Sequence, residues 1–298
     1  MRIVLVLLAT ALLLAPDPSA GQSGLKVYIS ADMEGVAGVV TGDHLGPGGF
    51  EYQKAREWLT AEVNAAIQGA RAAGATEILV SDSHGNGENI LLDRLPEDVR
   101  LVRSWPRPLM MMEGIDASYD AVLFIGYHAS TTNPRGVRAH TMSSGNFTAV
   151  KLNGVPVPEA AINAAIAGHF DVPVVMISGD DAIAQEANAL LGDMETAVLK
   201  QALGFHSAVT VTPEVAYRLI EEKARTGLER LSDFRPYRLE TPIRVEVSFK
   251  NYLPAEILDY LSIVERVDSH TIAFTGEDMV EVSRFLAFIG RYRPDISP

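Results

Sequence analysis

The chain has 298 residues, a length that suits one large domain or a main domain with a smaller partner. Hydrophobic residues make up 47% of it, which is enough for a sizeable core and argues against disorder. The formal net charge of −13, without any run of Lys and Arg interleaved with aromatic residues, argues against nucleic-acid binding.

The first twenty residues have the pattern of a signal peptide. Arg2 precedes an apolar run over residues 3–15, and small residues and prolines lead to Ala20. The run is short for a membrane span, although an uncleaved anchor is the alternative. The chain contains no Cys, which excludes disulfides, a thiolate zinc site and a Cys nucleophile. We therefore expect export, with cleavage after about residue 20, to a bacterial periplasm.

From residue 25 the pattern alternates strands with helices. It predicts strands over residues 25–31, 77–82, 121–128, 147–152 and 172–180, and helices over 52–73, 158–170 and 181–191. This rhythm predicts an α/β fold whose largely parallel sheet is covered by helices on both faces.

The pattern changes after about residue 231. Pro236 and Pro242 frame a stretch typical of a linker, and the alternating segment 243–250 then predicts a half-exposed strand. Shorter segments follow: helices near 255–261 and 277–288, and strands near 263–267 and 271–274. We therefore expect a catalytic α/β domain over residues 21–235 and a smaller C-terminal α+β lobe over 236–298.

Side chains that can bind metal ions or move protons follow three of the predicted strands, and two more come later in the chain. They are Asp32, Glu34, Asp82, His84 and His128 at strand ends, His140 in a loop, and Glu159 at a helix start. Because ligands bind at the carboxyl ends of parallel strands, we expect these residues to meet at one edge of the sheet. Asp32 and Glu34, two positions apart in extended chain, would project to the same side.

Carboxylates and neutral imidazoles together suit a divalent ion such as zinc, manganese or cobalt. Three carboxylates with two histidines would neutralise much of the charge of two ions, and Asp32 could bridge them. Taken singly, an Asp or Glu after a strand is usually a turn former, and a lone His is usually structural. The coincidence at successive strand ends favours a metal site.

The remaining histidines and short motifs indicate no second site. His44, His169, His206 and His270 are predicted to be structural, and Met110–Met112 to be core or pocket lining. The sequence contains no phosphate-binding G-x-x-x-x-G-K-[ST], no H-E-x-x-H and no G-x-S-x-G.

Several segments resemble the D-aminopeptidases of the DppA type. They are VYISADMEGVAGV, EILVSDSHG, MMEGID, AVLFIGYHA, GVRAHTM and LNGVPVPEAAINAAIAGHFDVPVVMISGDD. The resemblance covers nearly everything from residue 25 onward and shares order, spacing and strand context. One departure is Pro158, where the family pattern leads us to expect a small polar residue or Gly. Another is the export signal, since the resemblance implies a cytoplasmic protein.

The resemblance implies a peptidase with two zinc ions per chain. It implies Asp32 as the bridging ligand, and Glu34, His84, His128 and Glu159 as the other ligands. His140 matches the family's proposed catalytic residue, either as a nucleophile or as an acid–base or oxyanion group. The resemblance also implies a homo-oligomeric ring whose sites face an inner channel, which would restrict substrates to short peptides.

Three functions follow from these observations. The first is the removal of N-terminal residues, with D-residues as one possibility, from short peptides. The second is a different metal-dependent amidase or phosphoesterase, although a phosphoesterase should gather more basic residues than Arg135 and Arg138 near the metals. The third is a periplasmic solute-binding protein, which would not need such a set of carboxylates and histidines.

Overall fold

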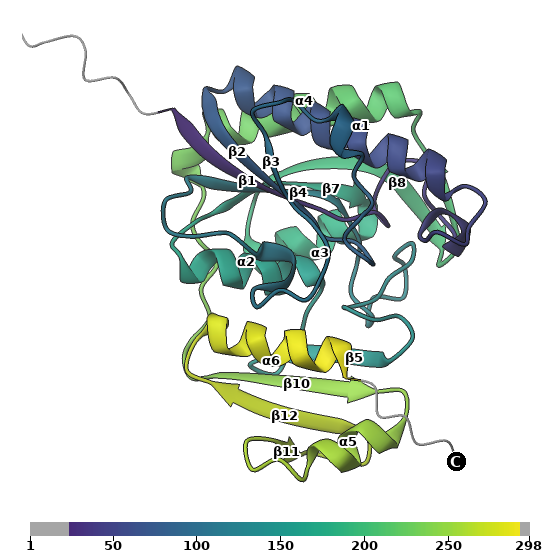
Figure 1. Cartoon of the computed structure of the whole chain (residues 1–298), viewed down its shortest axis with the longest axis vertical. Coiled ribbons are helices and arrows are strands. Elements are labelled where there is room, and N and C mark those ends of the chain that lie inside the picture. Colours follow the sequence, from purple (N-terminus) through teal and green to yellow (C-terminus); the bar gives the residue numbers. More distant parts are fainter. Residues whose placement is uncertain (1–23, 293–298) are drawn as a thin grey trace, which may run out of the picture.

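A seven-stranded sheet forms the centre of the larger part of the molecule (Figure 1). The computed structural model describes residues 24–292, so the predicted signal peptide lies outside the described part of the chain. The strand order is β3-β2-β1-β4-β7-β8-β9, and every pair is parallel except β8–β9. The strands are β1 (Leu25–Ala31), β2 (Ala75–Asp82), β3 (Arg100–Val102), β4 (Ala121–Tyr127), β7 (Val174–Asp180), β8 (Glu195–Gly204) and β9 (Ser207–Thr210).

Helices cover both faces of this sheet (Figure 1). Strand β1 shows why, because its side chains alternate between two apolar clusters: Val27 and Ile29 pack in one, Tyr28 in the other. The first cluster lies between the sheet and helices α1 and α4. The second cluster lies on the opposite face, between the sheet and helices α2 and α3. These helices are α1 (Tyr52–Ala72), α2 (Glu159–His169), α3 (Asp181–Leu191) and α4 (Pro213–Glu229).

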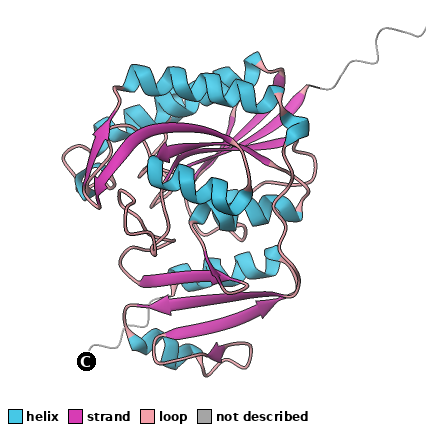
Figure 2. Ribbon diagram, turned by 180° about the vertical axis from the view of Figure 1, so that it is seen from behind, coloured by secondary structure: helices cyan, strands magenta, loops and turns pink. Residues whose placement is uncertain are grey.

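A second, antiparallel sheet builds the smaller lobe (Figure 2). Its order is β11-β12-β10-β5-β6, and α6 lies between this sheet and α2 (Figure 1). Buried residues of the two lobes belong to one apolar cluster, so the lobes share a continuous core. The elements are β5 (Phe147–Leu152), β6 (Val155–Pro156), β10 (Ile243–Phe249), α5 (Tyr252–Leu258), β11 (Glu265–Arg266), β12 (Thr271–Gly276) and α6 (Met279–Arg291).

Strand β5 differs from the predicted α/β rhythm. It pairs antiparallel with β10 in the smaller sheet rather than joining the parallel sheet. Phe147, Val150 and Leu152 are buried and Thr148 is exposed, as expected for a sheet with one face packed on the core. The smaller sheet is therefore built from two separate parts of the chain, and the boundary at residue 236 stays a prediction.

The other predicted elements from residue 25 onward are present, with shifts of a few residues at their ends. Residues 192–231, for which the sequence suggested no elements, contain β8, β9 and α4. Within residues 24–292, no helix is both long enough and apolar enough to cross a membrane. The predicted α/β class, with a largely parallel sheet and a smaller α+β lobe, is confirmed.

Candidate active site

Three neighbouring strands place the candidate ligands at one edge of the parallel sheet. Strands β2, β1 and β4 are adjacent, and Asp32 follows β1, His84 follows β2 and His128 follows β4. Glu159 is the first residue of α2, directly after Pro158. The structure thus brings the predicted residues together at the carboxyl ends of the strands, where α/β sheets bind their ligands.

Glu34 reaches the site from a turn, not from extended chain as expected. The strand ends at Ala31, and the turn that follows packs tightly on the end of β4. The N–H of Gly35 donates to the carbonyl of Gly126 at 2.7 Å, and a Cβ at Gly35 would lie 2.1 Å from the Tyr127 carbonyl oxygen. Only glycine permits this approach, which folds Glu34 back beside Asp32.

The acidic and imidazole side chains form two triads that share Asp32. In the first triad, His84 Nδ1 lies 3.1 Å from Asp32 Oδ1 and 2.9 Å from Glu34 Oε2. In the second triad, His128 Nε2 lies 3.2 Å from Asp32 Oδ2 and 3.5 Å from Glu159 Oε1. The two oxygens of Asp32 therefore face different histidines.

The other ring nitrogen of each histidine has a main-chain partner. His84 Nε2 lies 2.8 Å from the Leu45 carbonyl, and His128 Nδ1 lies 3.1 Å from the Ala129 carbonyl. If these nitrogens carry the protons and donate to the carbonyls, Nδ1 of His84 and Nε2 of His128 are left as bases that face the carboxylates. A second hydrogen bond of this kind is typical of metal-binding histidines.

Charge interactions within the cluster shift several pKa values. Burial and the neighbouring Glu34 carboxylate raise the pKa of Asp32. Burial opposes ionisation of Glu34, but the attraction of His84 outweighs it and holds the pKa of that carboxyl well below its usual range. Burial also disfavours charged imidazoles, yet Glu34 raises the pKa of His84, and Glu159 that of His128, well above the ordinary value. The cluster therefore favours positive charge among its carboxylates.

The donor set fits metal ions. Asp32 Oδ2 and His128 Nε2 are buried, face each other at 3.2 Å and make no hydrogen bond to any other group of the described residues, which is costly for polar atoms unless something else binds them. Around one tetrahedral zinc ion, two donors lie roughly 3.4 Å apart, given zinc–ligand bonds of about 2.0–2.2 Å. The donor separations of 2.9–3.5 Å in the two triads match this spacing.

His140 stands beside the second triad. Its ring stacks on that of His128, with centroids 4.1 Å apart and planes 8° apart. Its Nδ1 lies 2.8 Å from the Arg138 carbonyl, and its Nε2 lies 3.8 Å from Glu159 Oε1 and 4.0 Å from Glu34 Oε1. These separations exceed those of His84 and His128, so His140 is less closely engaged with the carboxylates.

The remaining candidates lie outside the triads. Asp82 accepts hydrogen bonds from the main-chain N–H groups of Asn89 and Ile90, at 2.6 and 2.7 Å, and so organises the loop that carries His84. None of the other histidines of the described chain belongs to a cluster of possible metal-binding residues, in line with their predicted structural role; they are His44, His169, His206 and His270.

Two buried charged residues that the sequence analysis missed hold the turn after β1. Lys200 of β8 donates to the carbonyl of Glu34 and, at 2.6 Å, to that of Val39. Glu62 of α1 accepts from the N–H of Ala37 at 2.9 Å. Burial raises the pKa of Glu62 to about 8 and lowers that of Lys200 to about 8. In the sequence, both residues stand out because Lys200 lies in an apolar strand and Glu62 lies on the apolar face of a helix.

We expect Lys200→Met to destabilise the fold and weaken metal binding. The variant would leave two buried carbonyls without their donor, at a cost of about 2–4 kcal/mol in the free energy of unfolding. Denaturant unfolding and zinc titration measure the two effects. Lys54→Met is the control, because Lys54 pairs with Glu57 on the surface, where ion pairs contribute little. Equal losses in both variants would contradict a supporting role for Lys200.

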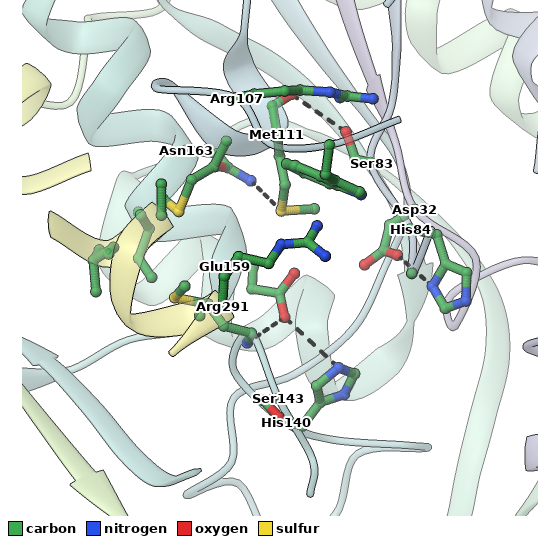
Figure 3. Close-up of a pocket in the computed structure, with 18 of the residues that line it drawn as sticks. Asp32, Ser83, His84, Arg107, Met111, His140, Ser143, Glu159, Asn163 and Arg291 are labelled. Atoms are coloured by element: carbon green, nitrogen blue, oxygen red, sulfur yellow. Dashed lines mark hydrogen bonds and ion pairs between the residues drawn. The ribbon is translucent and has the colours of Figure 1, made fainter. Parts of the chain in front are cut away.

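A pocket of about 380 Å³ opens onto the cluster (Figure 3). Asp32, His84, Glu159 and His140 line it, whereas His128 lies behind His140. The other lining residues come mainly from the segment 105–111, the loop 142–144, α2 and the end of α6, with further contributions from Leu45, Ser83 and Gly85. Met110 and Met111 are lining residues, and Met112 is fully buried, as predicted for this segment. Both lobes therefore contribute to the pocket.

Buried carboxylates and imidazoles at the carboxyl edge of a parallel sheet, open to a pocket, are the arrangement expected of a metal-dependent hydrolase. A family model described as D-aminopeptidase (peptidase family M55) matches residues 25–288. The chain belongs to this D-aminopeptidase family, so the family suggested by the sequence motifs is confirmed, and the protein is a hydrolase.

Two relatives support this assignment. A D-aminopeptidase of Bacillus subtilis (strain 168) is 35% identical over 260 residues, which are 86% of this chain and 93% of that protein. A solved structure is described as the Zn-dependent D-aminopeptidase DppA from Bacillus subtilis, a self-compartmentalizing protease. It matches with a TM-score of 0.86 and 32% identity, over 92% of this chain and 100% of that chain.

Proposed function

We propose that the chain is a two-zinc aminopeptidase, with Asp32 as the bridging ligand. The observation that carries the proposal is the division of Asp32 between two triads: Oδ1 faces His84 and Oδ2 faces His128. Glu34 would complete one zinc site and Glu159 the other. Zinc is the ion of choice because the solved relative is zinc-dependent and the ligand set suits it.

Zinc bound there would polarise a peptide carbonyl and lower the pKa of water. The other groups of the pocket would position the substrate and move protons. His140 lines the pocket, so its imidazole can give a proton to the leaving amine or donate to the developing oxyanion. Glu159 also accepts from the N–H of Met142 at 2.6 Å, which ties the His140 loop to the ligand cluster.

The proposed substrates are short peptides, from which the enzyme would release the N-terminal residue, preferably a D-residue. Family membership and the pocket volume of about 380 Å³, near the lower end for small-molecule sites, support this choice. A solute-binding protein is set aside because the family is one of hydrolases. A phosphoesterase is set aside because the family acts on peptides.

Assembly and location are further parts of the proposal. A homo-oligomeric ring is supported by the self-compartmentalizing relative and by apolar residues exposed on the β8–β9 hairpin at the edge of the sheet, Leu203 and Val209. Export to the periplasm rests on the sequence pattern of residues 1–20 alone.

We expect purified protein to contain about two equivalents of zinc per chain, and chelation to abolish peptide hydrolysis. Elemental analysis by mass spectrometry measures the metal. D- and L-alanyl dipeptides, assayed before chelation, after it and after zinc is returned, measure the activity. Recovery with zinc would separate metal removal from irreversible unfolding.

Two results would count against the proposal. One is less than about half an equivalent of any transition metal in protein prepared without chelator. The other is full activity after exhaustive chelation. If the protein contained one equivalent of zinc per chain and were fully active, the site would hold a single ion and not two.

A further inference from the structure

Helix α6 of the smaller lobe brings a positive charge into the pocket. Leu286, Ala287, Gly290 and Arg291 from its last turns are among the lining residues. Figure 3 shows the guanidinium of Arg291 reaching into the space between the labelled side chains. A Cβ at Gly290 would lie 3.1 Å from Met142 Cε, so the end of the helix packs closely on the loop that follows His140.

We infer that Arg291 binds the C-terminal carboxylate of the substrate, so that peptides with a free carboxylate are preferred to peptides whose carboxylate is blocked. The inference rests on the proposed function, because it places the scissile bond at the acidic cluster. Besides its N-terminal amine, a dipeptide bound there has one charged group, its carboxylate. The carboxylates of the cluster repel that group, whereas a guanidinium can bind it with two parallel hydrogen bonds.

The second arginine of the pocket does not compete for this role. Arg107 is buried, and its Nη1 donates to Ser81 Oγ and its Nη2 to the Asp82 carbonyl, both at 2.9 Å. Its guanidinium is thus used to support the strand end that carries His84. Arg291 is an exposed residue. Both guanidinium groups lie over Trp105, at 4.2 Å for Arg107 and 5.1 Å for Arg291, which gives this wall an ordered, positively charged surface.

A substrate whose C-terminal carboxylate is blocked would lose the contact with Arg291. Dipeptides should therefore bind better than their C-terminal amides.

The test compares alanyl-alanine with alanyl-alaninamide, in the configuration that the enzyme hydrolyses. In the zinc-loaded wild type, KM for the acid should be roughly 10- to 100-fold below KM for the amide. Arg291→Met should remove most of this preference by raising KM for the acid, with kcat changed by less than about threefold. Arg291→Lys should keep part of this preference, because lysine retains the positive charge but lacks the two parallel N–H donors of a guanidinium. Arg284→Met is the matched control, because Arg284 is exposed on α6 and does not line the pocket.

Two results would overturn this inference alone. Equal KM values for acid and amide in the wild type would show that no group recognises the carboxylate, and this comparison needs no variant. Changes by the same factor for both substrates in Arg291→Met, with altered zinc content, would mean that Arg291 only balances the acidic cluster. Hydrolysis of neither substrate by zinc-loaded wild type would overturn the proposed function and this inference with it.

Discussion

Replacing Asp32 by alanine is expected to abolish zinc binding at both positions and to lower kcat/KM by roughly four orders of magnitude or more. Asp32 is the carboxylate that the two proposed zinc sites share, with one oxygen facing His84 and the other facing His128, and it is 2% exposed. Its removal would leave His84 and His128 without the carboxylate that they share. The measurements are zinc content and steady-state kinetics on an alanyl dipeptide.

His169→Ala is the control for this variant. His169 is an exposed residue at the end of α2, the helix that Glu159 begins, and it lies outside every candidate metal cluster of residues 24–292. It should keep full zinc content and near-normal kinetics. Similar losses in both variants, with the fold intact by circular dichroism, would show that the ligand assignment is wrong. Asp32→Asn keeps the size of the side chain and should still lose zinc, because the bridging role needs the negative charge.

Local sequence patterns were sufficient for the core of the fold. Buried strands such as β1 are continuous apolar runs, and α1 has the helical spacing of an amphipathic segment that ends before Gly74. Such signals depend on a few neighbouring residues. They gave the parallel sheet, its covering helices and the strand ends that carry Asp32, His84 and His128.

The partner of a strand is a different matter, as β5 shows. Its apolar residues Phe147, Val150 and Leu152 are visible in the sequence, but its pairing with β10 joins segments about a hundred residues apart. Nothing local distinguishes a strand that continues the parallel sheet from one that leaves it. The same limit applies to the site, where chemistry-bearing residues at strand ends were found but their supports were not.

Lys200, Glu62 and Arg291 were missed because each acts on a distant part of the chain. Lys200 binds the carbonyl of Glu34, Glu62 binds the N–H of Ala37, and Arg291 enters the pocket from the smaller lobe. A charged residue in an apolar segment is a weak signal by itself. Its meaning depends on which buried group it faces, and only the folded chain shows that.

His140→Ala should keep zinc and fold but lose roughly two to four orders of magnitude in kcat. The side chain of His140 is 13% exposed, against 1% for His128, and it lies between that ring and the pocket. A substrate in the pocket would therefore meet His140, while His128 stays behind it. Kinetics on an alanyl dipeptide, zinc content and thermal unfolding measure the three properties.

The outcome also separates three roles for this histidine. His140 forms a possible triad with Glu34 and His128, so loss of zinc in His140→Ala would make it a ligand. A covalent nucleophile should leave an acyl-imidazole that rapid quenching can trap in the wild type. We expect full zinc and no trapped intermediate, because Nε2 lies 3.8 Å or more from both nearby carboxylate oxygens, farther than the nitrogens of His84 and His128 that face the triads.

His206→Ala, at an exposed residue outside the site, is the control and should turn over normally. Near-normal turnover of His140→Ala would show that proton transfer in this pocket does not depend on it.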